Sequence, residues 1–306
     1  MANNARKVMQ NFNSSTQFDL VGNDSEALDI NWALTNYCNY DCSYCYNKTL
    51  MRRTPNKNAE YKVILKRLKM CQVCFDILLD GGEPTKHPNL QFILEELEKI
   101  DNCKQIEVHT NFTESIDYYY NLRNITKLNI KASYHPEYHY NFIEKLKMAI
   151  AEKKNNFMVS VNLSSDKKFW NKTEEVIIFC QTHAVGYELN YLHDTENVKI
   201  GYTEQFFKIF DQYITNRDGA IVHVIDNKIY NFTESKIYQL GLTYKGMSCF
   251  PRMYRIESNG EIINGCNGIK LPLVIKKEHV NQAYICPHEI CSCSEMLFFK
   301  RTKKYQ

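Results

Sequence analysis

Short strand-like runs alternate with longer helical runs between Asp29 and Asn216, and this alternation constrains the fold most. The clearest helical runs, with apolar residues spaced three or four positions apart, are Tyr61–Met70, Leu90–Ile100 and Phe142–Glu152. The strand candidates are Ile30–Thr35, Phe75–Asp80, Gln105–Thr110, Lys127–Ser133, Phe157–Leu163 and Tyr187–Tyr191. Strands separated by helices form βαβ units around a parallel sheet. Six units are too few for an eight-fold barrel, so we expect an α/β fold, a partial (β/α)6 TIM-like barrel.

The pattern changes beyond residue 216. Ile221–Ile225 is a candidate for one further strand, and Tyr254–Ser258 and Glu261–Ile263 flank an Asn259-Gly260 pair. Asn-Gly between two strand-like runs is typical of a hairpin with a type I′ turn. We therefore expect a small C-terminal, cysteine-rich β-hairpin/helix domain beside the barrel. The predicted division is an N-terminal extension at 1–28, the barrel at 29–216 and the C-terminal domain at 217–306.

Charge and hydropathy exclude several classes of protein. Lys and Arg number 38 against 35 for Asp and Glu, a balance too even to indicate nucleic acid as a partner. No apolar run reaches the roughly 18–20 residues of a membrane span. The polar start, Met1 to Gly22, lacks the apolar region of a secretory signal. We expect a cytoplasmic protein without a membrane partner.

Cysteine is abundant, with 12 residues in the chain. In a cytosolic protein, so many thiols indicate metal ligands rather than disulfides. We expect the four scattered cysteines, Cys71, Cys74, Cys103 and Cys180, to lie in the core. The others form an N-terminal and a C-terminal group: Cys38, Cys42 and Cys45; and Cys249, Cys266, Cys286, Cys291 and Cys293. Two dense groups predict two metal sites.

The N-terminal group, Cys38-x3-Cys42-x2-Cys45, directly follows the first predicted strand. Three thiolates can hold three corners of a [4Fe–4S] cluster and leave the fourth iron open. A zinc site completed by a remote histidine fits the spacing equally well. The second predicted strand ends in Gly81-Gly82-Glu83-Pro84, where the glycines allow close approach of the backbone to a ligand. Alone, that run could be an ordinary tight turn.

Together the two motifs resemble those of the radical S-adenosylmethionine (SAM) superfamily, over roughly Ile30–Phe210. The resemblance implies an enzyme in which a reduced [4Fe–4S] cluster cleaves SAM to a 5′-deoxyadenosyl radical. That radical removes a hydrogen atom from the substrate, while the barrel orients the reactants and excludes water. The resemblance also implies an external one-electron reductant such as a flavodoxin or ferredoxin.

Through the matching motifs, the resemblance implies roles for seven residues of this chain. Three thiolates ligate the cluster, an aromatic residue lies beside the adenine, and the glycine turn receives the methionine amino group. In that order these are Cys38, Cys42 and Cys45; Tyr44; and Gly81, Gly82 and Glu83.

Three polar residues at later strand ends, Asn111, Ser133 and Asn162, match positions where the family commonly binds SAM. The alternative for each is strand-end hydrogen bonding or helix capping. Lys131 and His135 flank Ser133 and could face the substrate. Because a lone histidine is more often structural, we give neither a catalytic role.

The C-terminal group resembles a twitch domain, the shortened relative of the SPASM domain, which carries an auxiliary [4Fe–4S] cluster. Its members are spaced Cys249-x16-Cys266 and Cys286-x4-Cys291-x-Cys293. The pattern departs from the family, because the last ligands usually form CxxC. Five thiols suffice for one cluster, and the spacing does not say which four bind. A zinc ribbon is the alternative.

The resemblance leaves the substrate open. The leading hypothesis is hydrogen abstraction from a small-molecule or carbohydrate-like substrate, leading to oxidation, coupling or epimerisation. The alternative is a maturase of a ribosomally synthesised peptide. Only 28 residues precede the barrel, whereas many peptide modifiers carry a leader-binding domain there, and this favours a small molecule. A hypothesis of another class is a non-catalytic iron–sulfur or zinc protein with a binding or regulatory role.

Overall fold

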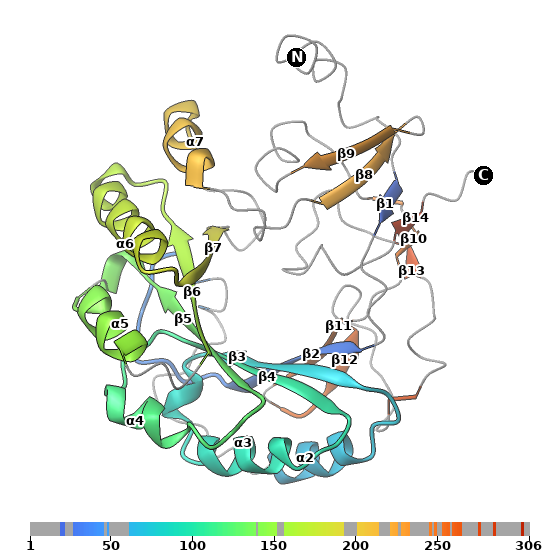
Figure 1. The fold of residues 1–306 in the computed structure, drawn as a ribbon. Helices are drawn as coiled ribbons and strands as arrows, with labels where there is room; N and C mark the ends of the chain where they lie inside the picture. Colours follow the sequence, from blue (N-terminus) through green and yellow to red (C-terminus); the bar gives the residue numbers. More distant parts are fainter. Residues whose placement is uncertain are drawn as a thin grey trace.

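The computed structural model contains two β-sheets with helices around the larger one (Figure 1). The larger sheet has eight strands in the order β12-β11-β2-β3-β4-β5-β6-β7, and the smaller has six in the order β13-β10-β14-β1-β8-β9. The structure describes residues 19–21, 27–45, 48, 61–138, 140–151, 156–192, 201–213, 221–225, 228–232, 245–246, 248–249, 253–257, 259–264, 275–276, 284–285 and 301–302.

Six parallel strands, adjacent in chain order, form most of the larger sheet. Their bounds are β2 Leu28–Thr35, β3 Phe75–Gly81, β4 Cys103–Thr110, β5 Leu128–Tyr134, β6 Asn156–Leu163 and β7 Gly186–Tyr191. All six predicted strands are present, so the expectation of an α/β fold with a mostly parallel sheet is confirmed. Because parallel strands run the same way, their carboxyl ends lie along one edge of the sheet.

Helices cover the outer face of the curved sheet (Figure 1). Each buries one apolar stripe, as Ile64, Leu65 and Leu68 do in α2. The bounds are α2 Tyr61–Lys69, α3 Leu90–Glu98, α4 Ile116–Asn121, α5 Phe142–Ala151, α6 Trp170–Thr182 and α7 Glu204–Phe210. Short 3-10 helices occur at η1 Pro84–Lys86, η2 Pro136–Tyr138, η3 Lys167–Phe169 and η4 Asp211–Tyr213.

None of the helices within the described ranges is long and apolar enough to cross a membrane.

The strands alternate between an apolar outer face and a polar inner face. On β4, Ile106 and Val108 are buried in the core, whereas Glu107 and His109 point to the opposite face. A parallel sheet packed on both faces is normally apolar on both. The polar inner face therefore distinguishes this sheet from a closed, side-chain-filled barrel and leaves room for polar contents.

The predicted hairpin is present and extends the larger sheet at β2. Strand β11 (Met253–Ile256) pairs in parallel with β2, and β12 (Ile262–Asn264) pairs antiparallel with β11. The turn is not the predicted type I′, which needs positive φ at both central residues. Gly260 has a φ of 85°, but it closes the turn instead of occupying one of its two central positions. The Gly260 N–H donates to the carbonyl of Glu257 at 2.8 Å, which indicates a longer loop with glycine at its bulge.

The smaller sheet contains strands from the N-terminal and the C-terminal parts of the chain. Its strands are β1 Asp19–Val21, β8 Ile221–Ile225, β9 Lys228–Phe232, β10 Ser248–Cys249, β13 Tyr284–Ile285 and β14 Arg301–Thr302. The predicted strand at 221–225 is thus present as β8. Strand β1 lies between β14 and β8 and is antiparallel to both. Cys249 lies in β10, whereas Cys266, Cys286, Cys291 and Cys293 fall outside the described residues. The predicted domain boundaries stay a prediction.

Candidate cofactor site at the carboxyl ends of the strands

The structure places Cys38, Cys42 and Cys45 together on the segment that leaves the carboxyl end of β2. We call residues 38–45 the cysteine loop. Cys42 is buried, Cys38 and Cys45 are half-buried, and all three are free thiols. The Cys45 N–H donates to the carbonyl of Cys42 at 3.2 Å, which closes a turn between the last two thiols. The position and the grouping agree with the motif.

The glycine turn packs directly against the chain that leads into the cysteine loop. The Gly82 N–H donates to the Thr35 carbonyl at 2.6 Å, and the Glu83 N–H donates to the Tyr37 carbonyl at 2.7 Å. A Cβ on Gly82 would lie 2.1 Å from the Tyr37 oxygen. Gly81 has a φ of +114°, and its Cβ would lie 2.4 Å from the Thr35 oxygen. The motif predicts that the glycines make room for a ligand; the close approach in this structure is instead to the backbone before Cys38. Contact with SAM stays a prediction.

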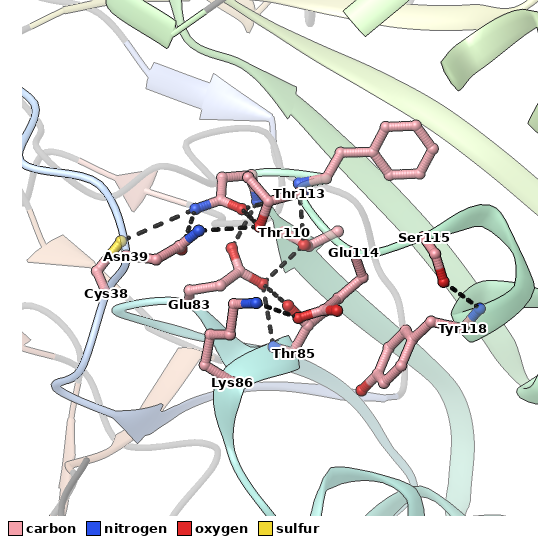
Figure 2. A network of polar contacts seen from close by, with 12 residues as sticks. Cys38, Asn39, Glu83, Thr85, Lys86, Thr110, Thr113, Glu114, Ser115 and Tyr118 are labelled. Atoms are coloured by element: carbon pink, nitrogen blue, oxygen red, sulfur yellow. Dashed lines mark hydrogen bonds and ion pairs between the residues drawn. The ribbon is translucent and has the colours of Figure 1, made fainter. Parts of the chain in front are cut away.

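Glu83 ties the ends of β3 and β4 together (Figure 2). Its side chain is buried, and its carboxylate accepts from the Thr85 N–H and hydroxyl at 3.0 and 2.6 Å. It also accepts from the Thr110 hydroxyl and the Asn111 N–H, each at 2.7 Å. Burial raises the pKa of Glu83, and these donors act in the opposite direction by stabilising the carboxylate. The carboxylate predicted to receive the methionine amino group thus already holds two strand ends.

Asn111 connects Glu83 to the cysteine loop through hydrogen bonds. Its Nδ2 donates to Asn39 Oδ1 at 2.8 Å and lies 3.9 Å from the sulfur of Cys38. Its Oδ1 accepts from the hydroxyl of Thr113 at 2.8 Å, and that hydroxyl accepts from Asn39 Nδ2 at 3.0 Å (Figure 2). Asn111 was predicted to contact SAM or to bond at the strand end. The structure shows the strand-end bonding, and the SAM contact stays a prediction.

A strained residue holds Asn111 in place. Phe112 has a φ of 58°, a conformation that costs a residue with a side chain about 1–3 kcal/mol. The surrounding contacts over-determine it, because the ring is buried between Tyr119 and Phe142. The Lys145 ammonium also donates to the carbonyls of residues 112, 113 and 114 at 2.7–3.1 Å. The loop after β4 therefore presents Asn111 to Cys38 in one orientation.

Tyr44 and Cys42 meet His135, which follows β5. The Tyr44 hydroxyl lies 3.1 Å from His135 Nδ1, and the Cys42 sulfur lies 3.6 Å from the same nitrogen. The two rings are stacked at a centroid distance of 6.1 Å. Burial lowers the pKa of His135 to about 4, with Glu137 opposing, so the imidazole is neutral near pH 7. In this structure His135 packs as a neutral ring against the cysteine loop.

A pocket of about 220 Å³ lies beside Tyr44 at the carboxyl ends of β6 and β7. Its lining combines aromatic, apolar and hydroxyl-bearing side chains. The lining residues are Ser43, Tyr44, Glu137, Ser164, Ser165, Asp166, Lys168, Phe169 and Leu192. The pocket therefore adjoins the cysteine loop, and aromatic, hydroxyl-bearing and charged residues line it.

Ser133 and Asn162 lie on the inner face of the sheet. Ser133 is in register with Ser160 of β6, and Asn162 is in register with Asn190 of β7. Their neighbours along the strands, such as Val161 and Leu163, are buried on the outer face. The structure thus places both residues where a ligand on the inner face would meet them, and their role stays a prediction.

An ion-pair network crosses the inner face from β4 to β7. Glu107 contacts His109 Nε2 at 2.5 Å and Lys131 Nζ at 3.4 Å, and Lys131 also contacts Glu188 at 2.8 Å. Burial disfavours the ionised form of Glu107, but His109 and Lys131 outweigh it and hold its pKa down at about 2. Burial also opposes the charge on Lys131, yet Glu188 and Glu107 raise its pKa. Lys131 is therefore committed to two carboxylates on the inner face.

The cysteine loop fits an iron–sulfur cluster. Within the described residues, no three His, Cys, Asp or Glu side chains converge on a single-ion site. A cluster needs no such convergence, because each thiolate binds a different iron. Burial raises the pKa of Cys38 to about 11 and of Cys42 to about 12. A bound cationic group would offset that desolvation. The Tyr40 N–H, 3.4 Å from the Cys38 sulfur, supplies a hydrogen bond to the ligand.

Comparisons with known proteins agree with this geometry. Residues 32–132 match the model of the Radical SAM superfamily. No curated protein matches the chain. Among solved structures, Streptococcus suis SuiB bound to S-adenosylmethionine is similar with a TM-score of 0.53 and 17% identity, covering 81% of this chain and 63% of SuiB. The structure of anSMEcpe with bound AdoMet and a Cp18Cys peptide is similar with a TM-score of 0.52 and 17% identity, covering 80% of this chain and 75% of anSMEcpe.

This chain therefore spans less than two thirds of the length of SuiB, and at this identity the two likenesses show a shared fold. The residues that sequence reasoning missed are Asn39, Thr110, Thr113, Glu137 and Tyr138. Their one sequence signal is position, since each ends a strand, stands within four residues after one or lies within the cysteine motif. Residues 32–132 match the Radical SAM superfamily model, and the chain shares the fold of the two solved structures.

Proposed function

We propose that the chain is a radical SAM enzyme that reductively cleaves S-adenosylmethionine and abstracts a hydrogen atom from its substrate. The observation that carries the proposal is the cysteine loop, with the glycine turn packed against its start and Asn111 beside Cys38. When bound, the [4Fe–4S] cluster and SAM supply the 5′-deoxyadenosyl radical. An external flavodoxin or ferredoxin is the proposed reductant.

The residues of the chain hold and orient these groups. Cys38, Cys42 and Cys45 are the proposed cluster ligands, and Gly81 to Glu83 form the proposed methionine side. The pocket beside Tyr44 supports adenine binding there, because a purine stacks on an aromatic ring and needs polar partners at its edge. Ser133 and Asn162, on the inner face, are proposed to contact SAM.

The inner face favours a polar substrate. Glu107, His109, Lys131 and Glu188 line it, so a polar ligand could hydrogen-bond to them, whereas an apolar ligand would displace their water and add no hydrogen bond. This supports a small polar or carbohydrate-like molecule as substrate. A peptide substrate is the second candidate, favoured by the likeness to anSMEcpe, whose structure contains a peptide. The reaction would be an oxidation, coupling or epimerisation.

An auxiliary [4Fe–4S] cluster is the proposed role of the C-terminal cysteines. Five thiols supply the four ligands and one spare residue. Such a cluster would accept an electron from the substrate radical or anchor the substrate.

Anaerobic reconstitution tests the proposal. We expect about eight iron and eight sulfide per chain, as two four-iron clusters. Reduction in the presence of SAM should then release 5′-deoxyadenosine. Stoichiometric zinc without visible charge-transfer absorption would contradict both clusters. Full iron content without deoxyadenosine would instead support the non-catalytic iron–sulfur protein.

A further inference from the structure

The segment His135–Tyr138, directly after β5, contacts five consecutive residues of the cysteine loop, from Tyr40 to Tyr44. No sequence motif joins the two segments, which stand more than 90 positions apart. The closest contacts are made by Glu137. Its carboxylate accepts from the Ser43 N–H at 2.8 Å and from the Ser43 hydroxyl. Charge-assisted hydrogen bonds of this kind are about twice as strong as neutral ones.

Tyr138 holds the loop on the other side of Cys42. Its ring stacks on Tyr40 at a centroid distance of 4.1 Å, with an angle of 12° between the planes. Its hydroxyl accepts from the Asp41 N–H at 3.1 Å. Cys42 thus lies between two anchored backbone amides, those of Asp41 and Ser43. Its own sulfur lies 3.6 Å from His135 Nδ1.

Cys38 and Cys42 are thus supported by different segments of the chain. Cys38 meets Asn111, directly after β4, whereas Asp41, Cys42 and Ser43 meet the segment after β5. Since the amides on both sides of Cys42 are already paired, little further ordering of the loop is needed when a ligand binds.

We propose that Glu137 and Tyr138 are positioning residues for Cys42, which hold the cysteine loop in its ligand-binding geometry and tune the cluster through the Glu137 charge. This inference rests on the proposed function, because it takes Cys42 to be a cluster ligand. Partners that orient a metal ligand tune both its affinity and its electronics. A carboxylate near a cluster also disfavours the gain of an electron, so Glu137 should lower the reduction potential.

Glu137→Gln tests the proposal, with Glu144→Gln as the matched control. Glutamine keeps the shape but loses the charge and one acceptor oxygen. Glu144 undergoes the same chemical change on the exposed face of α5, where it pairs with Lys147. In reconstituted full-length protein, we measure the rate of iron loss to a chelator and the midpoint potential of the cluster whose EPR signal responds to SAM. Glu137→Gln should lose iron several-fold faster and show a more positive potential, and Glu144→Gln should match wild type.

A purely structural role would lower the thermal stability of the metal-free protein without moving the potential. Equal iron loss and equal potential in folded Glu137→Gln and wild type would overturn the positioning role alone. If Glu137→Gln does not fold, Ser43→Ala replaces it, because it removes one donor to the same carboxylate and keeps the charge. Ser43→Ala should lose iron faster at an unchanged potential, and wild-type iron retention would overturn the proposal. Wild-type protein that takes up no iron at all would contradict the proposed function itself.

Discussion

Cys42 is the most buried thiol of the cysteine loop, with 6% of its surface exposed. Replacing it by Ala should abolish SAM cleavage and leave about four iron per chain, because two thiolates cannot hold a cluster with an open iron. Iron analysis and 5′-deoxyadenosine formation measure this directly.

Cys180→Ala is the matched control, because Cys180 lies on α6, is fully buried in the core of the protein and is not part of the cysteine loop. It should keep wild-type iron and deoxyadenosine. Deoxyadenosine at the wild-type rate in Cys42→Ala would refute the assignment of Cys42.

Gly82 is constrained by its distance from the Tyr37 carbonyl. In Gly82→Ala the new Cβ would stand 2.1 Å from that oxygen, so the end of β3 must move away from the chain before Cys38. We expect a loss of about 1–3 kcal/mol in the free energy of unfolding, typical of overpacking, together with lower iron content. Thermal unfolding of the metal-free protein and iron analysis after reconstitution check the two effects.

The control for this prediction is Gly201→Ala. Gly201 has positive φ, at 47°, whereas Gly82 does not, and a Cβ on Gly201 meets nothing within 4 Å. It should cost only the strain of the backbone conformation and leave the iron content unchanged. If Gly82→Ala melted and bound iron like wild type, the close approach to Tyr37 would have no consequence. The motif alone predicts that a side chain at Gly82 weakens SAM binding more than it lowers thermal stability. The structure predicts lower stability together with lower iron content.

Residues within short motifs could be predicted, whereas their partners could not. The three thiols and the glycine turn are recognisable because the ligand chemistry fixes their spacing. Glu137 and Thr110 could not be recognised, because their partners Ser43 and Glu83 stand far away in the sequence. Only the fold brings these pairs together, and a single sequence contains no record of it.

At the scale of elements, the periodic segments were predictable and the continuous apolar runs were not. All six barrel strands and helices α2, α3 and α5 follow from period-2 and period-3.6 patterns. Ser115 begins α4 by accepting from the Tyr118 N–H, as its position before Asp117 hints. The sequence does not predict helix α6, because its run Val176–Cys180 is apolar throughout and suits a buried strand equally well.

The ion-pair network joins elements β4, β5 and β7, and it predicts a pH effect. The pKa of Glu107 is about 2 in the folded protein, below its ordinary value of 4.5. A carboxyl whose pKa is lowered by folding stabilises the protein above its unfolded pKa, and this stabilisation is lost as the pH falls towards the folded value. Wild-type stability should therefore decrease between about pH 4.5 and pH 2.

Glu107→Gln should be less stable than wild type at pH 7 and show a weaker decrease over that acid range. Denaturant unfolding at several pH values measures, for wild type and the variant, how the free energy of unfolding changes with pH. Glu144→Gln, changed on the exposed face of α5, should keep the wild-type slope. Parallel pH curves for Glu107→Gln and wild type would show that the network does not stabilise the fold.

At the scale of the whole molecule, the position of the hairpin could not be read from the sequence. Asn-Gly predicts the hairpin itself, but pairing of Met253 with Asp29 joins residues from opposite ends of the chain. The same holds for β1, which lies between two strands from the C-terminal part. Local propensity carries no information on such long-range pairing. As a result, the cysteine-rich part and the barrel share a sheet, and the chain around Cys266 begins at β12 of that sheet.

This connection bears on the proposed auxiliary cluster. Cys266 follows β12, which ends at Asn264, so a cluster bound there would be tied in sequence to the sheet that carries the cysteine loop. Cys266→Ala should leave about four iron per chain and largely intact SAM cleavage, because that chemistry needs only the first cluster. Product formation should collapse, since the substrate radical could no longer pass on its electron or be held in place.

Cys74→Ala, which removes a half-buried thiol outside both groups, serves as the control and should keep both clusters. Metal binding contributes folding energy to small cysteine-rich units, so the solubility of Cys266→Ala must be measured alongside its iron content. If Cys266→Ala aggregated and Cys74→Ala stayed soluble, the second cluster would have a structural role. A soluble variant that has lost that cluster and still turns over substrate normally would reject the catalytic role. Deoxyadenosine without product would support it, because the two clusters would then have separable tasks.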